Sequence, residues 1–436
     1  MDDIPHTHNL CTIEAWLNAA WVAIATLERL DDGEFGCRSP ARLTYLLEHA
    51  LVYADTRGPA ALSVNQPVAL MPNQNSTWPA VLADLLPQGD GRRRLAQHLD
   101  LPAERPASDW PLLLAGAGNP IGHLRIREAA DTLRHGRSQF DEGWTREEVC
   151  SRDASFLEQV HAAGFALGGS SGVQGEWPKL LLTQDAEQRW HLDHQLPDAK
   201  AARHWLVKFS RRDDSVYDDI LRAEAAYHAL AGELGLRTQG ESVYHQGLLF
   251  VQRFDRLLDA SGSMERIAQE SLYSLTGRTG FDQYLNHDQV CQALAECVTE
   301  PARELTEYVW RDAINLALGN RDNHGRNTAI QRFANGRIAL APIFDLAPMC
   351  LHPDAMARRM RWRQEEGGRP DWRAVAEQVA ETNVITAADL RGRYASWAAA
   401  LQGVPERLQT LGCPARVLTA IARPLAEVIA DLRKAS

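Results

Sequence analysis

Long apolar runs are missing from this sequence of 436 residues, and none approaches the ~18 residues that a membrane-spanning helix requires. The first residues are acidic and carry no basic stretch ahead of an apolar one, so no secretory signal is expected. The seven cysteines are scattered and form no Cys-x-x-Cys pair, which is typical of a reduced compartment. The sequence therefore predicts a cytoplasmic protein with no membrane span and no disulfide framework.

Positive charge is also scarce, and lysine is its scarcest source. Lys plus Arg total 46 against 57 Asp plus Glu, and this net charge of −11 argues against a general nucleic-acid coat protein. Only four of the 46 basic residues are lysine: Lys179, Lys200, Lys208 and Lys434. A lysine in so arginine-rich a chain is a candidate for a role that needs a compact ammonium group.

The apolar residues, 45% of the chain, are enough for two or three globular domains. The hydrophobic pattern predicts strands and helices in alternation before residue 260 and mostly helices after it. Strands are expected at residues 21–27, 180–183, 204–209, 248–251 and 337–340, and helices at residues 41–54, 78–86, 220–234 and 303–318. The final ~90 residues are expected to form alanine-rich helices with caps such as Thr386.

An Asp-x4-Asn loop, residues 319–327, follows the helix expected at residues 303–318. In phosphoryl transfer an Asp accepts or orients the hydroxyl proton, while an Asn about one turn away holds Mg²⁺. Asp322 and Asn327 have this spacing, and His324 between them is expected to organise the loop. Asp and Asn in a glycine-bearing loop are more often turn formers, so the loop needs support from other motifs.

A second carboxylate for Mg²⁺ is available in Asp345, after the strand expected at residues 337–340. The phosphates of ATP carry close to four negative charges that Mg²⁺ must offset, and a kinase uses a second Asp for this purpose. An Asp at the end of a strand is also a common helix cap, so this residue too is informative only in combination. The loop, the strand and then Asp345 together favour a kinase.

Lys208 lies inside an apolar strand, between Val207 and Phe209. A lysine there either extends to solvent from a sheet edge or faces a phosphate, and its rarity in this chain favours the phosphate. Glu224 follows in a helix, where it could hold Lys208 by an ion pair or remain a solvated carboxylate. Arg222 does not share a helix face with Glu224, so a local pair does not explain that residue.

A Gly/Ser-rich stretch precedes Lys208 and leads through Lys179 into a strand. Glycine-rich backbone can approach phosphates closely and offer N–H donors, although such a stretch can equally be a flexible turn. The candidates for nucleotide contact in and beside this loop are Gly172, Val173, Gln174 and Lys179. The complete order is glycine loop, strand lysine, helix glutamate, Asp-x4-Asn and metal Asp, which is the order of a protein kinase.

With these motifs in place, the chain resembles the HipA toxin kinases of bacterial toxin–antitoxin systems. The similarity covers most of the chain, and Gly-Asn-x-Asp-Asn-His-Gly-Arg-Asn at residues 319–327 is its most specific block. Further blocks match in order at residues 61–63, 85–89, 116–124, 206–209, 251–256, 269–271 and 343–345. The resemblance implies an α/β, two-lobed, protein-kinase-like fold with an α/β N-terminal lobe and an all-helical C-terminal lobe. The implied domains are a HipA-type N-terminal subdomain (1–135), a kinase N-lobe (136–258) and a C-lobe (259–436).

The resemblance also implies a role for each site residue. Asp322 would be the catalytic base with Lys208 on the α/β-phosphates, Asn327 and Asp345 would bind Mg²⁺, and the backbone from Gln252 to Phe254 would form the adenine hinge. Ser170 and Ser171 are the hydroxyls available for the autophosphorylation that switches the family off. The sequence departs from the family in a longer glycine loop, at residues 175–178, and in Gln252, where many members have Glu.

The implied activity is ATP- and Mg²⁺-dependent phosphorylation of a protein serine or threonine, such as one on an aminoacyl-tRNA synthetase, with growth arrest as the outcome. The implied partner is a helix-turn-helix antitoxin, with DNA bound only through that complex. Two other readings stay open: a non-catalytic co-repressor and a kinase of small molecules. The basic run at residues 356–363 could dock a substrate or nucleic acid, or could be a solvated helix face balanced by Glu365 and Glu366.

Overall fold

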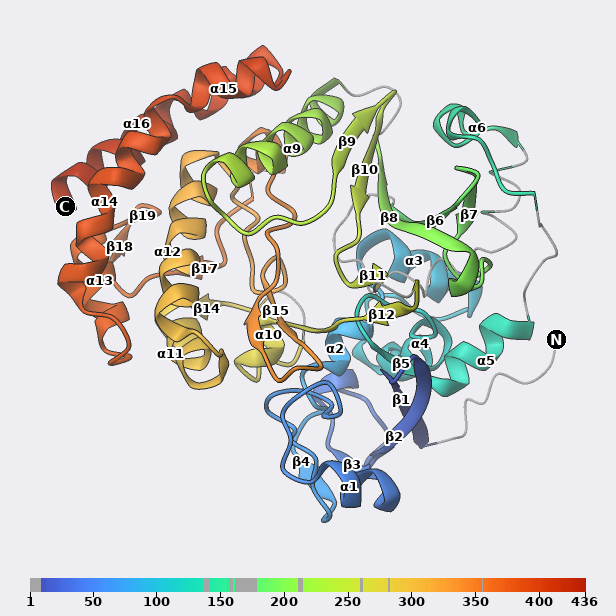
Figure 1. The fold of residues 1–436 in the computed structure, drawn as a ribbon. Helices are drawn as coiled ribbons and strands as arrows, with labels where there is room; N and C mark the ends of the chain where they lie inside the picture. The colour runs from blue at the N-terminus through green and yellow to red at the C-terminus, as the bar shows by residue number, and fades with distance from the viewer. Residues whose placement is uncertain are drawn as a thin grey trace. The chain divides into compact units, whose positions relative to one another are not determined.

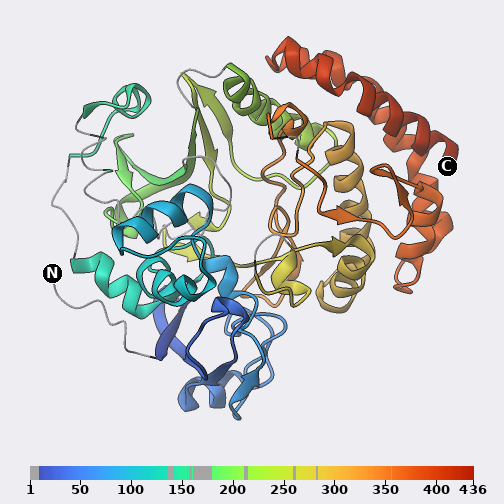
Figure 2. The same cartoon turned by 180° about the vertical axis from the view of Figure 1, so that it is seen from behind.

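The computed structural model describes residues 9–135, 142–154, 156, 160, 179–210, 215–258, 262–280, 283–354 and 356–436. The chain separates into two compact units (Figures 1 and 2). The first contains Met1–Phe209, Phe250–Phe281 and Arg332–Gly336, and the second contains Ser210–Leu249, Asp282–Gln331 and Arg337–Ser436. Strands and helices occur in both, which confirms the predicted α/β class. No described helix is long and apolar enough to cross a membrane.

The N-terminal part of the first unit is a five-stranded antiparallel sheet in the order β4-β3-β2-β1-β5. A two-residue turn, Asn18 and Ala19, joins β1 to β2, and both residues have positive φ, as tight hairpins require. The elements of this part are β1 (Leu10–Leu17), β2 (Ala20–Arg29), β3 (Ala41–Tyr45), α1 (Leu47–Tyr53), β4 (Asn73–Asn75), α2 (Leu82–Leu85), α3 (Gly89–His98), α4 (Asp109–Gly116), β5 (Leu124–Ile126) and α5 (Arg127–His135), with 3₁₀ turns at Gly36–Arg38 and Pro106–Ser108.

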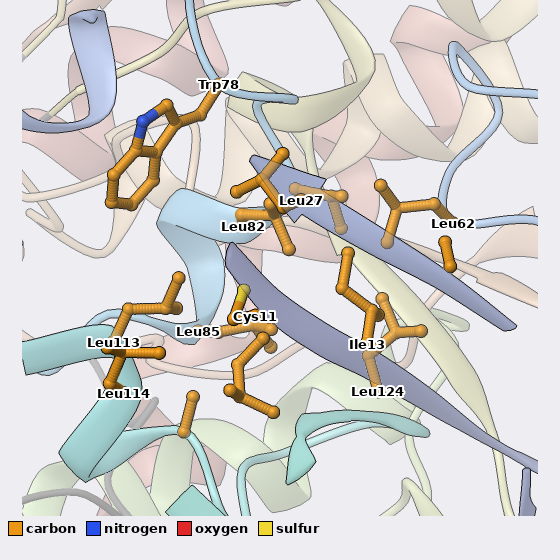
Figure 3. Close-up of a cluster of buried hydrophobic side chains, with 14 of the residues drawn as sticks. Cys11, Ile13, Leu27, Leu62, Trp78, Leu82, Leu85, Leu113, Leu114 and Leu124 are labelled. Atoms are coloured by element: carbon orange, nitrogen blue, oxygen red, sulfur yellow. The ribbon is translucent and has the colours of Figure 1, made fainter. Parts of the chain in front are cut away.

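A hydrophobic core lies between this sheet and the helices that follow it (Figure 3). Ile13 of β1 and Leu27 of β2 are fully buried, and Leu82 and Leu113 pack against the same cluster from α2 and α4. Trp78 is 1% exposed and meets Trp110 edge to face, with ring centroids 5.5 Å apart. The burial of these large side chains fixes the helices on one face of the sheet.

The second sheet of the first unit carries the candidate nucleotide-binding residues. Its strands run in the order β7-β6-β8-β10, and β6 pairs with β8 antiparallel from Lys179 to Asp185. The elements of this part are α6 (Arg146–Ser151), β6 (Lys179–Asp185), β7 (Trp190–Leu192), a 3₁₀ turn (Asp198–Lys200), β8 (Ala201–Phe209), β10 (Leu248–Gln252, whose last three residues belong to this unit), β11 (Arg256–Leu258), β12 (Met264–Arg266), β13 (Ala268–Ser271) and α10 (Leu272–Leu275).

The second unit is mostly helical, and α12 packs between α11 and α16. Trp310 of α12 stacks on Trp397 of α14, with ring centroids 4.9 Å apart. The elements are α9 (Ser215–Glu233), β9 (Ser242–His245), β14 (Leu285–Asn286), α11 (His287–Cys297), α12 (Pro301–Ala317), β15 (Ala329–Arg332, whose last residue belongs to the first unit), β16 (Ile338–Leu340), a 3₁₀ turn (Met349–Leu351), β17 (Met360–Arg361), β18 (Glu365–Glu366), β19 (Arg369–Pro370), α13 (Trp372–Ala380), α14 (Ala387–Gln402), α15 (Val404–Thr410) and α16 (Ala415–Ala435).

Three local expectations need correction. Residues 41–54 are a strand followed by a short helix, because Ala41, Leu43 and Tyr45 alternate with less buried neighbours and pair with β2. Residues 78–86 are helical only at Leu82–Leu85, since the preceding turns close through i→i+3 bonds. The C-terminal lobe, predicted to be all-helical, also carries short strands such as β15 and β16 beside the catalytic-loop candidate. The division at residues 135 and 258 stays a prediction.

Candidate functional site

The catalytic-loop candidate begins at a sharp helix end. Ala317 is the last residue of α12, and Gly319 follows with a φ of +70°, in the left-handed region that favours glycine. A Cβ at Gly319 would lie 2.6 Å from Cys350 Sγ, and the Cys350 N–H donates to the Gly319 carbonyl at 2.9 Å. The turn therefore requires glycine for its backbone conformation and for the close approach of Cys350.

Asn320 is the residue around which this loop is organised. Its side chain is buried, and its Nδ2 donates to Asn315 Oδ1 at 2.7 Å and to the Asp345 carbonyl at 3.2 Å. Its Oδ1 accepts a hydrogen bond from the Asp322 N–H at 3.3 Å. One buried amide thus links α12 to both candidate carboxylate residues. The sequence motif does not predict this role for Asn320, although Asn320 is the second residue of the most specific block.

Asn327 closes the Asp-x4-Asn loop from its other end. Its Nδ2 donates to the Asp322 carbonyl at 2.8 Å, and its backbone N–H donates to the His324 carbonyl at 2.8 Å. Because the amide nitrogen is directed at Asp322, the amide oxygen is the atom that a metal ion would bind. His324 Nδ1 accepts from the Arg326 N–H at 3.3 Å, which agrees with its expected role in organising the loop.

Asp345 has an unusual backbone conformation. Its φ is +57°, in the left-handed region that non-glycine residues seldom adopt and that Asp tolerates better than most. Two hydrogen bonds hold this stretch: Asn320 donates to the Asp345 carbonyl, and the Ile343 N–H donates to the Arg237 carbonyl at 2.8 Å. Such conformations persist only where the surroundings impose them, and they concentrate at functional sites.

Asp322, Asn327 and Asp345 offer two carboxylates and one amide oxygen, which are donors that Mg²⁺ prefers. Mg²⁺ is usually bound by one or two carboxylates and completes its shell with water and substrate phosphates. Within the described ranges, no group of three or more His, Cys, Asp or Glu residues forms a closed protein cage for a metal ion. The donor set therefore fits a Mg²⁺ ion that is shared with a phosphate ligand.

Two of the three lysines of the first unit lie side by side on its second sheet. Lys179 of β6 and Lys208 of β8 are directly paired in the antiparallel register, so they project from the same face of the sheet. Lys208 is only 5% exposed. Two ammonium groups on one face of a sheet could both contact a polyanion such as a triphosphate.

The hinge candidates Gln252 and Phe254 flank Arg253 at the end of β10. The Arg253 N–H donates to the His204 carbonyl of β8 at 2.8 Å, which fixes where the connector leaves the sheet. The Arg253 guanidinium bridges Asp193 Oδ2 at 3.0 Å and Asp255 Oδ2 at 2.8 Å. The backbone of the candidate hinge is therefore held by a buried arginine.

Arg253 belongs to a larger buried group, here called the hinge ion network: Asp193, Arg253, Asp255 and Arg256. The Gly122 N–H donates to Asp255 Oδ2 at 2.7 Å, and Arg256 donates to the Gly122 carbonyl at 2.7 Å. Burial acts to raise the pKa of Asp255, but the neighbouring guanidinium groups outweigh it and lower that pKa. The network was not predicted, because its members are spread over residues 193–256.

The structure brings Asp322, Asn327 and Asp345 together through hydrogen bonds within the second unit, whereas Lys179, Lys208, Gln252 and Phe254 lie in the first. Glu224 is buried in α9 of the second unit, and its ion pair with Lys208 stays a prediction. Five candidates lie outside the described residues: Ser170, Ser171, Gly172, Val173 and Gln174.

The fold and the Asp-x4-Asn loop define a kinase-like class of protein, and comparison with known proteins gives the family. Residues 171–403, more than half of the chain, match the family model of the HipA-like C-terminal domain, and the chain belongs to this family. A protein of Sinorhizobium fredii named "Putative kinase Y4mE" is 29% identical over 315 residues, which are 69% of this chain and 71% of that protein.

A solved structure shares the fold over nearly the full length. It is HipA of the Shewanella oneidensis MR-1 toxin–antitoxin system, determined together with HipB and operator DNA. The alignment covers 95% of each chain with a TM-score of 0.61 and 15% sequence identity. At this identity the comparison shows a common fold and leaves the chemistry to be argued from the residues.

Proposed function

We propose that the protein is an ATP- and Mg²⁺-dependent serine/threonine protein kinase that acts as the toxin of a toxin–antitoxin pair. Membership of the HipA-like family supports a kinase, and the solved relative was determined with its antitoxin and operator DNA. The partner would be a helix-turn-helix antitoxin, with DNA bound only through that complex. The acceptor would be a component of translation such as an aminoacyl-tRNA synthetase.

The observation that carries the proposal is the Asn320 tether. It places the backbones of Asp322 and Asp345 in a fixed relation at the end of α12, as a kinase requires of its base and metal Asp. Asp322 would accept or orient the proton of the acceptor hydroxyl, and Asn327 and Asp345 would hold the metal. Bound Mg²⁺ would offset the charge of the nucleotide phosphates.

The first unit would bind the nucleotide. Lys208 and Lys179 would contact the phosphates, together with the backbone at Gly172, Val173 and Gln174. The backbone from Gln252 to Phe254 would bind the adenine, held in place by the Arg253 guanidinium. Glu224 would orient Lys208 by the ion pair expected from the sequence.

Autophosphorylation of Ser170 or Ser171 would switch the kinase off. A phosphate adds about −1.5 to −2 charges beside a pocket built for a triphosphate, so it would repel the nucleotide unless the loop moved away. Incubation with Mg·ATP should add phosphate at one of these serines in the wild type and none in Asp322→Gln. Identical, unmodified loops in both proteins by mass spectrometry would contradict the switch.

The function is tested by transfer of labelled phosphate from ATP in a cell lysate. We expect label on a discrete protein, and about 10²- to 10⁴-fold less of it with Asp322→Asn, because the base is lost. Asp431→Asn, an Asp of α16 in the same unit, is the matched control and should label as the wild type does.

The same experiment separates the alternatives. Label on small molecules would instead indicate a small-molecule kinase, and no label in either fraction would indicate a non-catalytic co-repressor. Equal labelling by the wild type and Asp322→Asn would show that Asp322 is not the base.

A further inference from the structure

The segment after Asp345 has an unusual composition. Residues 346–381 contain no serine, threonine or tyrosine. Many kinases order the corresponding segment by phosphorylating a hydroxyl, and the new phosphate then pairs with arginines. Residues 346–381 cannot be ordered in this way, so other contacts must hold this segment.

A carboxylate on α12 supplies such contacts. Asp312 is 2% exposed; its Oδ1 accepts from Arg358 Nη2 at 3.1 Å and its Oδ2 from Trp362 Nε1 at 2.9 Å. Both donors come from residues 356–366, here called the Arg-rich segment. Burial opposes ionisation of Asp312, yet the surrounding positive charge and N–H donors keep its pKa below the ordinary value.

His287 of α11 packs against the same group of residues, Asp312, Arg358 and Trp362. Its ring stacks on Trp362 with centroids 4.7 Å apart and planes 21° apart, and its Nδ1 hydrogen-bonds the Tyr308 hydroxyl at 2.7 Å. Burial lowers the pKa of His287 to about 4, so the ring is neutral near pH 7. His287 Nε2 also lies 3.5 Å from Asp312 Oδ1, so the ring contacts both the indole and the carboxylate.

The Arg-rich segment is also held along its own length. Arg358 Nη1 donates to Glu365 Oε1 at 3.1 Å, and the Trp362 N–H donates to Glu365 Oε2 at 3.3 Å. Met360 pairs in parallel with Leu285 between β17 and β14. Within one unit, the segment is therefore fixed to a helix, to a neighbouring strand and to itself.

This anchoring determines which side chains reach solvent. Met360 and Trp362 are buried, whereas the side chains of Arg361 and Arg363 remain 54% and 46% exposed. The alternation is that of a strand, so the basic run at residues 356–363 is not the solvated helix face that its composition allowed. Its buried members fix the backbone, and its exposed arginines are presented at defined positions.

We propose that Asp312 is a positioning residue that holds the Arg-rich segment preset for docking a protein acceptor, with no phosphorylation of that segment. The proposal rests on the kinase function proposed above. The Asp312 carboxylate is a permanent anion that pairs with an arginine of the segment, whereas in switchable kinases an added phosphate supplies the anion. Asp312 precedes the catalytic loop on α12, so the segment and the loop share one support.

The anchor is tested by digesting the native protein with trypsin and following cleavage after Arg361 and Arg363 by mass spectrometry. Asp312→Asn should be cleaved at least about tenfold faster than the wild type, because local opening sets the rate of cleavage. Trp362→Phe keeps the ring on His287 and loses one N–H donor, so an increase of about threefold is expected. Asp431→Asn breaks an outer pair with Arg369 and should change cleavage less than about twofold.

The docking role is tested with dephosphorylated casein as the acceptor. Trp362→Phe, whose fold is checked by its melting temperature, should raise KM for casein about fivefold and leave KM for ATP unchanged. Wild-type cleavage rates in both variants would overturn the anchor, and an unchanged KM for casein in an opened segment would overturn the docking role. No phosphate transfer by the wild type to casein or lysate protein would overturn the proposed function, and the cleavage rates would then decide the anchor alone.

Discussion

The candidate hinge and the candidate catalytic loop are held by different kinds of interaction. In the first unit, ion pairs hold the connector: Arg253 lies between Asp193 and Asp255, with all three side chains at most 3% exposed. In the second unit, the neutral amides of Asn320 and Asn327 hold the loop through the backbone oxygen atoms of Asp345 and Asp322. The contacts described are thus ion pairs in the first region and hydrogen bonds from amides to main-chain oxygen atoms in the second.

The difference follows from what each region would bind. Adenine is neutral and is read by backbone groups, so ion pairs behind the hinge do not compete with it. A metal ion needs ionised carboxylates, and an arginine salt-bridged to Asp322 or Asp345 would compete with it directly. The amide tethers of Asn320 and Asn327 bind main-chain oxygen atoms of these two residues.

The largest loss of stability is expected from removing an arginine of the hinge ion network. Arg253→Met should lower the free energy of unfolding by about 3–5 kcal/mol, because it strips a buried carboxylate of its partner. Arg42→Met, which removes an exposed ion pair with Glu28 in the same unit, should cost less than about 1 kcal/mol. Urea unfolding of both variants measures the difference, and equal losses would show that the hinge ion network contributes no more than a surface pair.

A smaller loss of stability is expected from removing the amide of Asn320. Asn320→Ala removes three hydrogen bonds of one buried amide and should lower the free energy of unfolding by about 2–3 kcal/mol. It should also slow phosphate transfer by about tenfold or more, because the carboxylate residues lose their common support. Asn286→Ala, at an exposed position whose side chain caps no helix, is the control and should change neither. Full activity in Asn320→Ala would remove the tether from the mechanism.

The smallest change in stability is expected from replacing one of the two paired lysines, Lys179 and Lys208. Lys179→Met removes one of two paired ammonium groups, so the free energy of unfolding should stay within about 1 kcal/mol of the wild type. Its KM for ATP should rise about tenfold or more, because a phosphate contact is lost. Lys200→Met, at a 3₁₀ turn before β8, should leave KM unchanged. A rise in both variants, or in neither, would contradict a specific role for Lys179.

The strands of the candidate site were predictable because local pattern and motif order agree there. Residues 204–209 and 248–251 lie within β8 and β10, and the predicted cap at Thr386 accepts from the Asp389 N–H. The helix predicted at residues 41–54 was wrong at its start, because pairing with β2 overrode a pattern that also suits a helix.

The supports of the site were not predictable from sequence. Asp193 and Arg253, or Asp312 and Trp362, are far apart along the chain, and each alone resembles an ordinary charged or aromatic residue. Asn320 is part of the motif, but the sequence does not show which carbonyl an asparagine side chain will bind. Local chemistry thus predicted the candidate site residues, and the folded chain shows which contacts hold them.

The hinge ion network also determines which truncated fragments of the protein can fold. Asn119 donates to Asp193, Pro120 accepts from Arg256, and Gly122 donates to Asp255, so residues 119–122 complete the network. A fragment begun at the predicted boundary near residue 136 would lack these partners and leave buried charged groups with unmet hydrogen bonds. The family match at residues 171–403 is therefore a unit of sequence comparison, and a fragment meant to fold must begin well before residue 119.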